Sequence, residues 1–343
     1  MARDILYEHV IFHNSFSLIR SLAALSESGS DSLSFHSTKS LVLDFFAWHQ
    51  CYNSVVKILK LCKNLRTLDL RYFSPRLYFN HNQMKLVINA IPSNLVALAY
   101  HGEFDESIMK TLNPFQKLEF LFLLPFLRSR SIGRDLSTFP HVRYITLPPD
   151  YAQRWSSYCP DARDISIIIT WDVHLRSPTA FQNNNPTAQS KVEHLNIATK
   201  TWFSRYTKFG DVISASFMQG FQNLIILSYN PFVLCVSQSH PFETHPTLQS
   251  VRHYITIPEV NHEGKGVDKA LQVGFKASWV RSWNWLHDGE DKFPRLKSIV
   301  GVYDCKEANE IEEDLLRYVD MLGGYDPKLS FACMLQCQEI RIH

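Results

Sequence analysis

The chain has 343 residues, of which 45% are hydrophobic and 20% are charged, and its 35 Lys+Arg nearly balance its 33 Asp+Glu. This composition supplies enough apolar side chains for a packed core and excludes global disorder. The net charge of +2 is also far from the strongly basic charge that is typical of proteins whose main partner is nucleic acid.

The ends and the cysteines indicate an intracellular protein, either cytoplasmic or nuclear. The first ten residues carry Asp4 and Glu8 and lack an uninterrupted apolar run, so no signal peptide is visible. The most apolar stretch, 118–127, is interrupted by Glu119 and Pro125, whereas a membrane span needs about 20 apolar residues. The seven cysteines are scattered through apolar segments, as reduced and buried thiols are.

One spacing, apolar-x-x-apolar-x-apolar, recurs along the chain after a short polar or proline-containing lead-in. Nine copies, the last two weaker, begin at Leu65, Leu95, Leu118, Val142, Ala162, Val192, Leu224, Leu248 and Leu296. Alternate residues of a strand point to the same side, so each copy predicts a short strand with its apolar residues inward. Helical patterns lie between several copies, as in 55–62 and 84–91. The sequence therefore predicts an irregular leucine-rich-repeat-like α/β solenoid, with parallel strands on the concave face and helices outside.

The predicted solenoid is a single domain, 1–343, capped at both ends. Its parts are an N-terminal cap (1–40), the repeats (41–257) with a polar, Asn-rich loop (170–190), a Trp-containing insertion (258–294), and the last repeat with a C-terminal cap (295–343). The N-terminal cap combines a strand at 5–12 with a helical apolar stripe of Phe16, Ile19, Leu22 and Leu25. The C-terminal cap combines a helix with a final strand around 339–343. Terminal repeats need such covers because their core would otherwise be exposed.

Several segments resemble a known family. Leu6-Tyr-Glu-His-Val-Ile-Phe, Leu18-Ile-Arg-Ser-Leu, Ser40-Leu-Val-Leu and Ile58-Leu-Lys-Leu-Cys-Lys-Asn-Leu-Arg-Thr-Leu-Asp-Leu are similar to the repeat region of fungal F-box proteins, especially those of mushroom-forming fungi (basidiomycetes). The resemblance covers nearly the whole chain and implies repeats that grip a protein partner. In that family a preceding F-box recruits the Skp1–cullin ubiquitin ligase. The chain opens at Met1 where the repeats begin, so we expect no F-box, and Skp1 is a partner only if one lies upstream.

The motifs of common catalytic and metal sites are missing from the sequence. No Gly-x-Ser-x-Gly elbow, phosphate-binding loop or His-Glu-x-x-His helix occurs. Cys333 and Cys337 lack the second cysteine pair that zinc would need. Four histidines lie loosely together in the sequence, and we expect them to be surface residues and not zinc ligands: His240, His245, His253 and His262. We therefore expect no enzyme activity, no metal and no cofactor.

Residues between the inward apolar positions are predicted to face a partner. Phe120, Phe122 and Tyr144 would form an apolar centre on neighbouring strands, and an apolar centre with a polar rim is typical of protein-binding patches. The more peripheral positions are Arg71, His101, Asp164 and His194. In the alternative arrangement, a lid or the 258–294 insertion covers the aromatic rings.

The predicted function is therefore non-catalytic recognition of a protein on the concave face. Trp279 and Trp283 share one helical face, so they either pack on the solenoid or form an exposed aromatic anchor for the partner. The alternatives are the substrate-receptor part of an SCF-type ubiquitin ligase and an enzyme with an unrecognised site. A membrane partner is not expected, and nucleic acid is disfavoured because no basic run accompanies the tryptophans.

Overall fold

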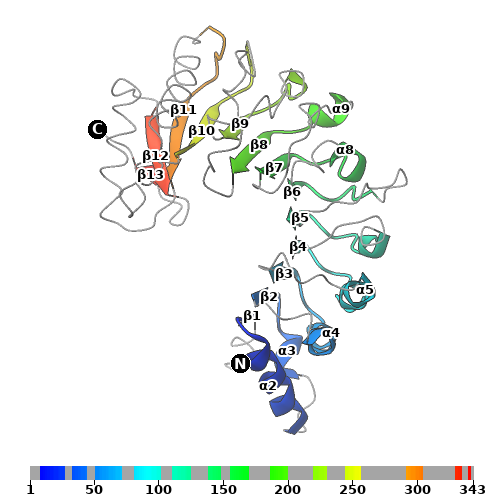
Figure 1. Ribbon diagram of the computed structural model, residues 1–343. Coiled ribbons are helices and arrows are strands. Elements are labelled where there is room, and N and C mark those ends of the chain that lie inside the picture. Colours follow the sequence, from blue (N-terminus) through cyan, green and yellow to red (C-terminus); the bar gives the residue numbers. More distant parts are fainter. Residues whose placement is uncertain are drawn as a thin grey trace, which may run out of the picture. The chain divides into compact units, whose positions relative to one another are not determined.

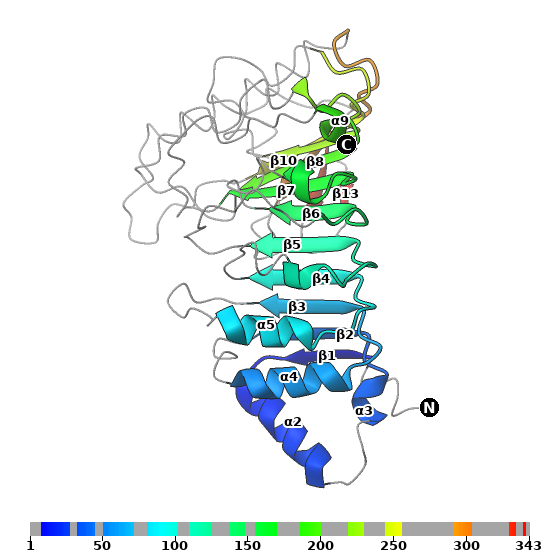
Figure 2. The ribbon, with the colours of Figure 1, turned by 90° about the vertical axis from the view of Figure 1, so that its right-hand side faces the viewer.

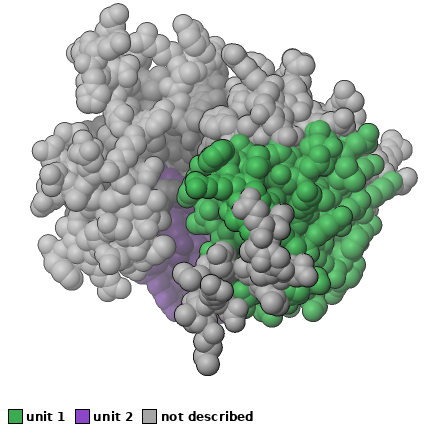
Figure 3. Space-filling model, turned by 90° about the horizontal axis from the view of Figure 1, so that it is seen from below, with its two compact units in different colours: residues 1–162 green, residues 163–343 purple. Residues whose placement is uncertain are grey.

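The structure is a computed structural model, and Figure 3 shows its two compact units, residues 1–162 (unit 1) and 163–343 (unit 2). The residues whose structure is described are 8–27, 33–44, 51–71, 81–101, 110–124, 138–147, 155–169, 186–199, 219–229, 244–255, 291–303, 329–333 and 339–340. Each unit is described by itself. The predicted boundaries of caps and insertion remain predictions, and the 258–290 part of the insertion lies outside these ranges.

Unit 1 contains six parallel strands that pair in chain order (Figures 1 and 2). These strands are β1 (His9–Phe12), β2 (Ser40–Asp44), β3 (Thr67–Arg71), β4 (Ala97–His101), β5 (Phe120–Leu124) and β6 (Tyr144–Leu147). The helices in the described part of unit 1 include α2 (Ser15–Glu27), α3 (Leu33–His36), α4 (Tyr52–Leu61), α5 (His81–Asn89) and α8 (Trp155–Tyr158). Figure 2 shows α4 and α5 on the same side of the strands, and we call the other side of the sheet the open face.

Unit 2 repeats this construction. Its strands are β7 (Asp164–Ile169), β8 (His194–Thr199), β9 (Ile226–Tyr229), β10 (Ser250–Ile255), β11 (Ser298–Tyr303), β12 (Leu329–Cys333) and β13 (Glu339–Ile340). The pairs β7–β8, β8–β9, β9–β10, β10–β11 and β11–β12 are parallel, and β13 runs antiparallel to β12. Strands β3 to β11 occupy the nine predicted copies, and β13 confirms the final strand. Both units thus have the predicted leucine-rich-repeat-like α/β solenoid fold.

The register of these strands is set by a repeated pair of backbone hydrogen bonds. The carbonyl of Arg66, just before β3, accepts hydrogen bonds from the N–H groups of Val96 (2.7 Å) and Ala97 (2.9 Å) in the next repeat. The carbonyl of Arg163 does the same for Glu193 (2.8 Å) and His194 (3.0 Å). Because a slip of one residue would move every inward side chain to the other face, this pairing fixes the core.

Most lead-ins begin with a buried residue that closes a turn, and Pro92, which is partly exposed, holds this position before β4. The Cys62 carbonyl accepts a hydrogen bond from the Leu65 N–H at 3.1 Å, and the Phe115 carbonyl accepts one from Leu118 at 3.1 Å. The buried residues that open the lead-ins include Phe35, Cys62, Phe115, Phe139, Cys159, Gln189, Phe221, His245 and Phe293. Burial raises the pKa of the Cys62 thiol to about 12, and it also raises the pKa of Cys159. These two cysteines and Cys51 are buried, as predicted.

The prediction of surface histidines is wrong for two of the four. His245 is 4% exposed and donates a hydrogen bond from Nε2 to the Phe221 carbonyl at 2.7 Å. His253 is 1% exposed and occupies an inward position of β10, where its ring meets Tyr229 edge-on with centroids 5.0 Å apart. Position within the repeat therefore decides burial even for a titratable residue. His240 and His262 lie outside the described residues.

Two further expectations need correction. In α2 the predicted stripe has the wrong phase, because Phe16 and Ile19 are 71% and 48% exposed while Leu18 is fully buried. The Asn14 Oδ1 accepts a hydrogen bond from the Ser17 N–H at 2.7 Å and caps the start of this helix, whose inward face carries Leu18. The loop predicted at 170–190 ends in a short helix, α9 (Pro186–Gln189), and the predicted C-terminal cap helix lies outside the described residues.

We predict that His253 makes stability depend on pH. Burial lowers the pKa of His253 from 6.5 to about 3, so between these values the unfolded chain binds a proton that the folded chain does not. The free energy of unfolding should therefore fall as the pH drops below 6.5, by roughly 1.4 kcal/mol per pH unit from this residue. Urea unfolding between pH 7.5 and pH 5 should show a shallower pH slope for His253→Phe. The control His141→Gln removes an exposed imidazole and should keep the wild-type slope; equal slopes for all three proteins would contradict the prediction.

Candidate recognition surface

The open face of unit 1 carries three aromatic rings, Phe120, Phe122 and Tyr144, which we call the aromatic patch. Phe120 and Tyr144 are register partners on β5 and β6, and their rings stack with centroids 4.3 Å apart and planes 6° apart. Phe122 is 42% exposed and Tyr144 is 39% exposed. The structure therefore brings together the three residues that the sequence placed at the centre of the surface.

The strands hold these rings in place, and the neighbouring side chains on β4 are small. Leu121 and Ile145, which alternate with the aromatic residues, are buried on the opposite face of the sheet. On β4, Ala97 pairs with Phe120 and Ala99 pairs with Phe122. Because these neighbours are alanines, the ring edges that face β4 are not walled off by a large side chain. The patch is a rigid apolar surface on a regular sheet.

The other predicted residues are placed less completely. Arg71 is the last residue of β3 and His101 is the last residue of β4, so both lie at one end of the open-face columns in unit 1. Their side chains are outside the described part of the structure. Trp279 and Trp283 also lie outside the described residues, so the two arrangements predicted for them remain open.

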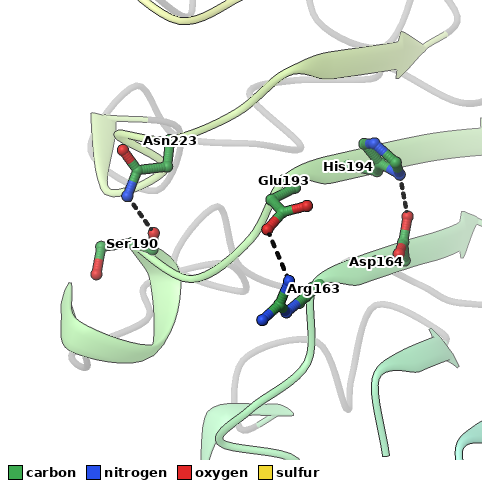
Figure 4. A network of polar contacts seen from close by, with 6 residues as sticks. All are labelled: Arg163, Asp164, Ser190, Glu193, His194 and Asn223. Atoms are coloured by element: carbon green, nitrogen blue, oxygen red, sulfur yellow. Dashed lines mark hydrogen bonds and ion pairs between the residues drawn. The ribbon is translucent and has the colours of Figure 1, made fainter.

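In unit 2 the predicted Asp164 and His194 form a pair. They are register partners on β7 and β8, and Figure 4 shows the His194 Nδ1 hydrogen-bonded to the Asp164 Oδ1. Arg163 and Glu193, the residues just before each strand, form an ion pair at 3.2 Å. Burial raises the pKa of the Asp164 carboxyl, and the interaction with His194 acts in the opposite direction.

This pair orients an imidazole but supplies no further reacting group. The carboxylate holds the Nδ1 side of the ring, which directs the Nε2 atom away from Asp164. Among the residues that the structure describes, Asp164 is the only side-chain partner of the His194 ring. Within the same residues, no group of three or more His, Cys, Asp and Glu side chains could hold a metal ion.

A second polar network on the open face of unit 2 connects three strands. The Asn196 Nδ2 on β8 donates a hydrogen bond to the Ser166 Oγ on β7 at 2.8 Å. The Asn196 Oδ1 accepts a hydrogen bond from the Tyr254 hydroxyl on β10, also at 2.8 Å. Tyr254 thus reaches across β9, where Ser228 is only 7% exposed. Sequence reasoning missed this network, although extending the outward positions to the weak copy at Leu248 would have placed Tyr254 on this face.

The ladder of one parallel strand per repeat defines the chain as a leucine-rich-repeat-like solenoid. No protein-family model and no curated protein matches its sequence. Among solved structures, the leucine-rich repeat-containing protein LegL7 from Legionella pneumophila is similar, with 13% identity, 87% of each chain covered and a TM-score of 0.40. In the described part of the chain, no helix has the length and apolar character needed to cross a membrane.

We predict that the Tyr254 hydroxyl stabilises unit 2. Tyr254→Phe removes the hydroxyl that donates a hydrogen bond to the Asn196 Oδ1. Because this partly buried amide oxygen then loses its donor, the free energy of unfolding should fall by about 1 kcal/mol. Urea unfolding measures this change. Tyr144→Phe is the matched control, because its ring is exposed on the sheet surface and its stacking on Phe120 survives. The prediction is wrong if the two variants unfold at the same urea concentration as the wild type.

Proposed function

We propose that this chain is a non-catalytic scaffold that binds a protein partner on the open face of its sheet, the face that the sequence predicted to be concave. The observation that carries the proposal is the aromatic patch, in which two of three adjacent rings are more than a third exposed. Large aromatic side chains dominate the binding energy of many protein interfaces. Solenoids also use this strand surface for extended partners.

The surroundings of the patch support the same function. Around its rings lie exposed polar residues, namely Thr67, Glu119 and Arg143. A fully apolar centre with a polar rim gives affinity at the centre and solubility when the partner is absent. Because the rings are carried by paired strands, little conformational entropy is lost when a partner binds them. The partner buries ring surface that water otherwise contacts.

Two other functions are distinguishable by experiment. The substrate-receptor role in an SCF-type ubiquitin ligase is supported by the sequence resemblance to fungal F-box proteins, and it requires that the full-length natural protein bind purified Skp1. The enzyme alternative is supported by the Asp164–His194 pair, which orients an imidazole. It requires a third group beside His194. The aromatic patch favours protein binding over catalysis, and the Skp1 experiment separates the scaffold from the substrate receptor.

We predict that charge placed on the aromatic patch abolishes partner capture. The double variant Phe122→Asp/Tyr144→Asp should lose about tenfold or more of the captured partner, because each carboxylate would be desolvated against apolar surface. Its melting temperature should stay near that of the wild type, since both side chains are exposed. The measurement is affinity capture from extracts of the source organism, quantified by mass spectrometry for each protein that the wild type enriches.

The matched control is Ile19→Asp/Leu86→Asp. These side chains are 48% and 52% exposed on α2 and α5 of the same unit, so the control removes similar apolar surface away from the open face. It should retain the partner. Equal loss in both double variants, or retention in both, contradicts the proposal. Unfolding of the aromatic variant alone would show that these rings belong to the core.

A further inference from the structure

Two small residues separate the aromatic patch from polar side chains on the open face of unit 1. Ala97 and Ala99 point outward from β4, because the residues that alternate with them, Leu98 and Tyr100, are buried. Both alanines are partly exposed. An alanine side chain ends at its Cβ atom, so these two positions lie lower than the longer side chains on each side of them. We call Ala97 and Ala99 the alanine strip.

The register places one polar and one aromatic side chain beside each alanine. Strand β4 pairs with β3 on one side and with β5 on the other (Figure 2). The two resulting rows across the strands are Thr67–Ala97–Phe120 and Asp69–Ala99–Phe122. None of the four flanking side chains is buried, so both rows are open to a partner.

One face of the Phe120 ring is turned toward the alanine strip. Its other face stacks on Tyr144, which lies on β6, on the side of β5 away from β4. The two rings are parallel to within 6° and stand on neighbouring strands, so the second face of Phe120 looks toward Ala97. The face of an aromatic ring attracts cations through its quadrupole.

Of the four flanking side chains, only Asp69 carries a charge. It stands across Ala99 from Phe122, two strand spacings or about 9–10 Å away. Asp69 already takes part in another interaction within the chain. A carboxylate nevertheless has about four lone-pair sites and accepts several donors at once. The alanine strip is therefore bordered by aromatic rings on one side and by a negative charge on the other.

We propose that the alanine strip binds an arginine side chain of the protein partner, an inference that rests on the proposed function. Ala97 and Ala99 lie two residues apart, about 6.6 Å along β4, which the long stem of an arginine can cover. The methylene stem packs over Ala97 against the Phe120 ring. The guanidinium lies over Ala99, between the Phe122 ring and the Asp69 carboxylate. Arginine suits both borders, because its planar group stacks on aromatic rings and donates hydrogen bonds to carboxylates.

The test measures the fluorescence anisotropy of fluorescein-labelled hexa-arginine with the full chain at about 50 mM salt, where exposed charges are weakly screened. Hexalysine and hexacitrulline are measured in parallel, since citrulline keeps the planar shape of arginine and lacks its charge. Two site variants probe the two parts of the site. Asp69→Asn removes the charge, and Ala99→Leu fills the strip while every charge is kept.

Each site variant has a matched control in the same unit. Asp161→Asn makes the same change of charge at an exposed position in the lead-in turn before β7. Ser40→Leu adds a leucine on β2, at an outward and partly exposed position beyond the strip. Melting temperatures are recorded for all four variants. The two site variants are independent, so a loss of folding in one leaves the other to decide.

The wild type should bind hexa-arginine more tightly than hexalysine, and hexacitrulline should bind weakest. Each site variant should weaken binding of hexa-arginine about fivefold or more, whereas each control should weaken it less than about twofold. The inference is overturned if hexa-arginine does not bind, or if hexalysine binds equally well. It is also overturned if site variants and controls lose affinity equally, which would indicate a diffuse field.

Failure of this inference is distinguishable from failure of the proposed function. If charge on the aromatic patch abolishes partner capture while binding of hexa-arginine ignores Asp69 and Ala99, the scaffold stands and only the arginine position is rejected. If capture ignores the aromatic patch while both site variants weaken binding of hexa-arginine, the arginine position stands and the proposed function is rejected.

Discussion

The rest of the structure depends on one backbone interaction, the carbonyl before a strand that accepts two N–H groups from the next repeat. It recurs before β2, β3, β4, β7, β8, β9 and β10 among others, with N···O distances between 2.7 and 3.2 Å. The interaction is made by the backbone, so it tolerates almost any side chain. It aligns equivalent positions of successive repeats into columns that run across each sheet. Chemistry on either face is therefore built column by column.

The inward columns show how far this tolerance extends. Most positions hold leucine, isoleucine or valine, but Tyr229 and His253 occupy two of them and are buried with their rings in contact. The lead-in column holds Gln189, whose side chain occupies the space that a Cβ on Gly220 would fill. A buried polar residue is stable here when its polar atoms form hydrogen bonds, as the Nε2 of His245 does with the Phe221 carbonyl. Shape and satisfied hydrogen bonds matter more at these positions than residue class.

The backbone sets the register of the strands, and the side chains set the chemistry of each face. This division explains which features could be predicted from the sequence and which could not. Spacing predicted β3 to β11 because alternate apolar residues and a lead-in turn are local signals. It did not predict β12, which lacks that motif, or the phase of α2, which depends on how the helix packs against the rest of the unit. The Tyr254–Asn196 contact joins residues 58 positions apart and passes over a whole strand. Such a contact depends on register, which becomes visible only once the strands are paired.

The open faces of the two units carry different chemistry. In the proposed function, the aromatic patch of unit 1 gains affinity by removing ring surface from water, a short-range effect that depends on close shape complementarity. The polar side chains on the open face of unit 2 instead bind one another across neighbouring strands, as Asn196 does with Ser166 and Tyr254. The ion pair between Arg163 and Glu193 is partly exposed and adds little stability. A partner that approached the polar face would have to break contacts that are already made, whereas the exposed rings of unit 1 lose only their contact with water.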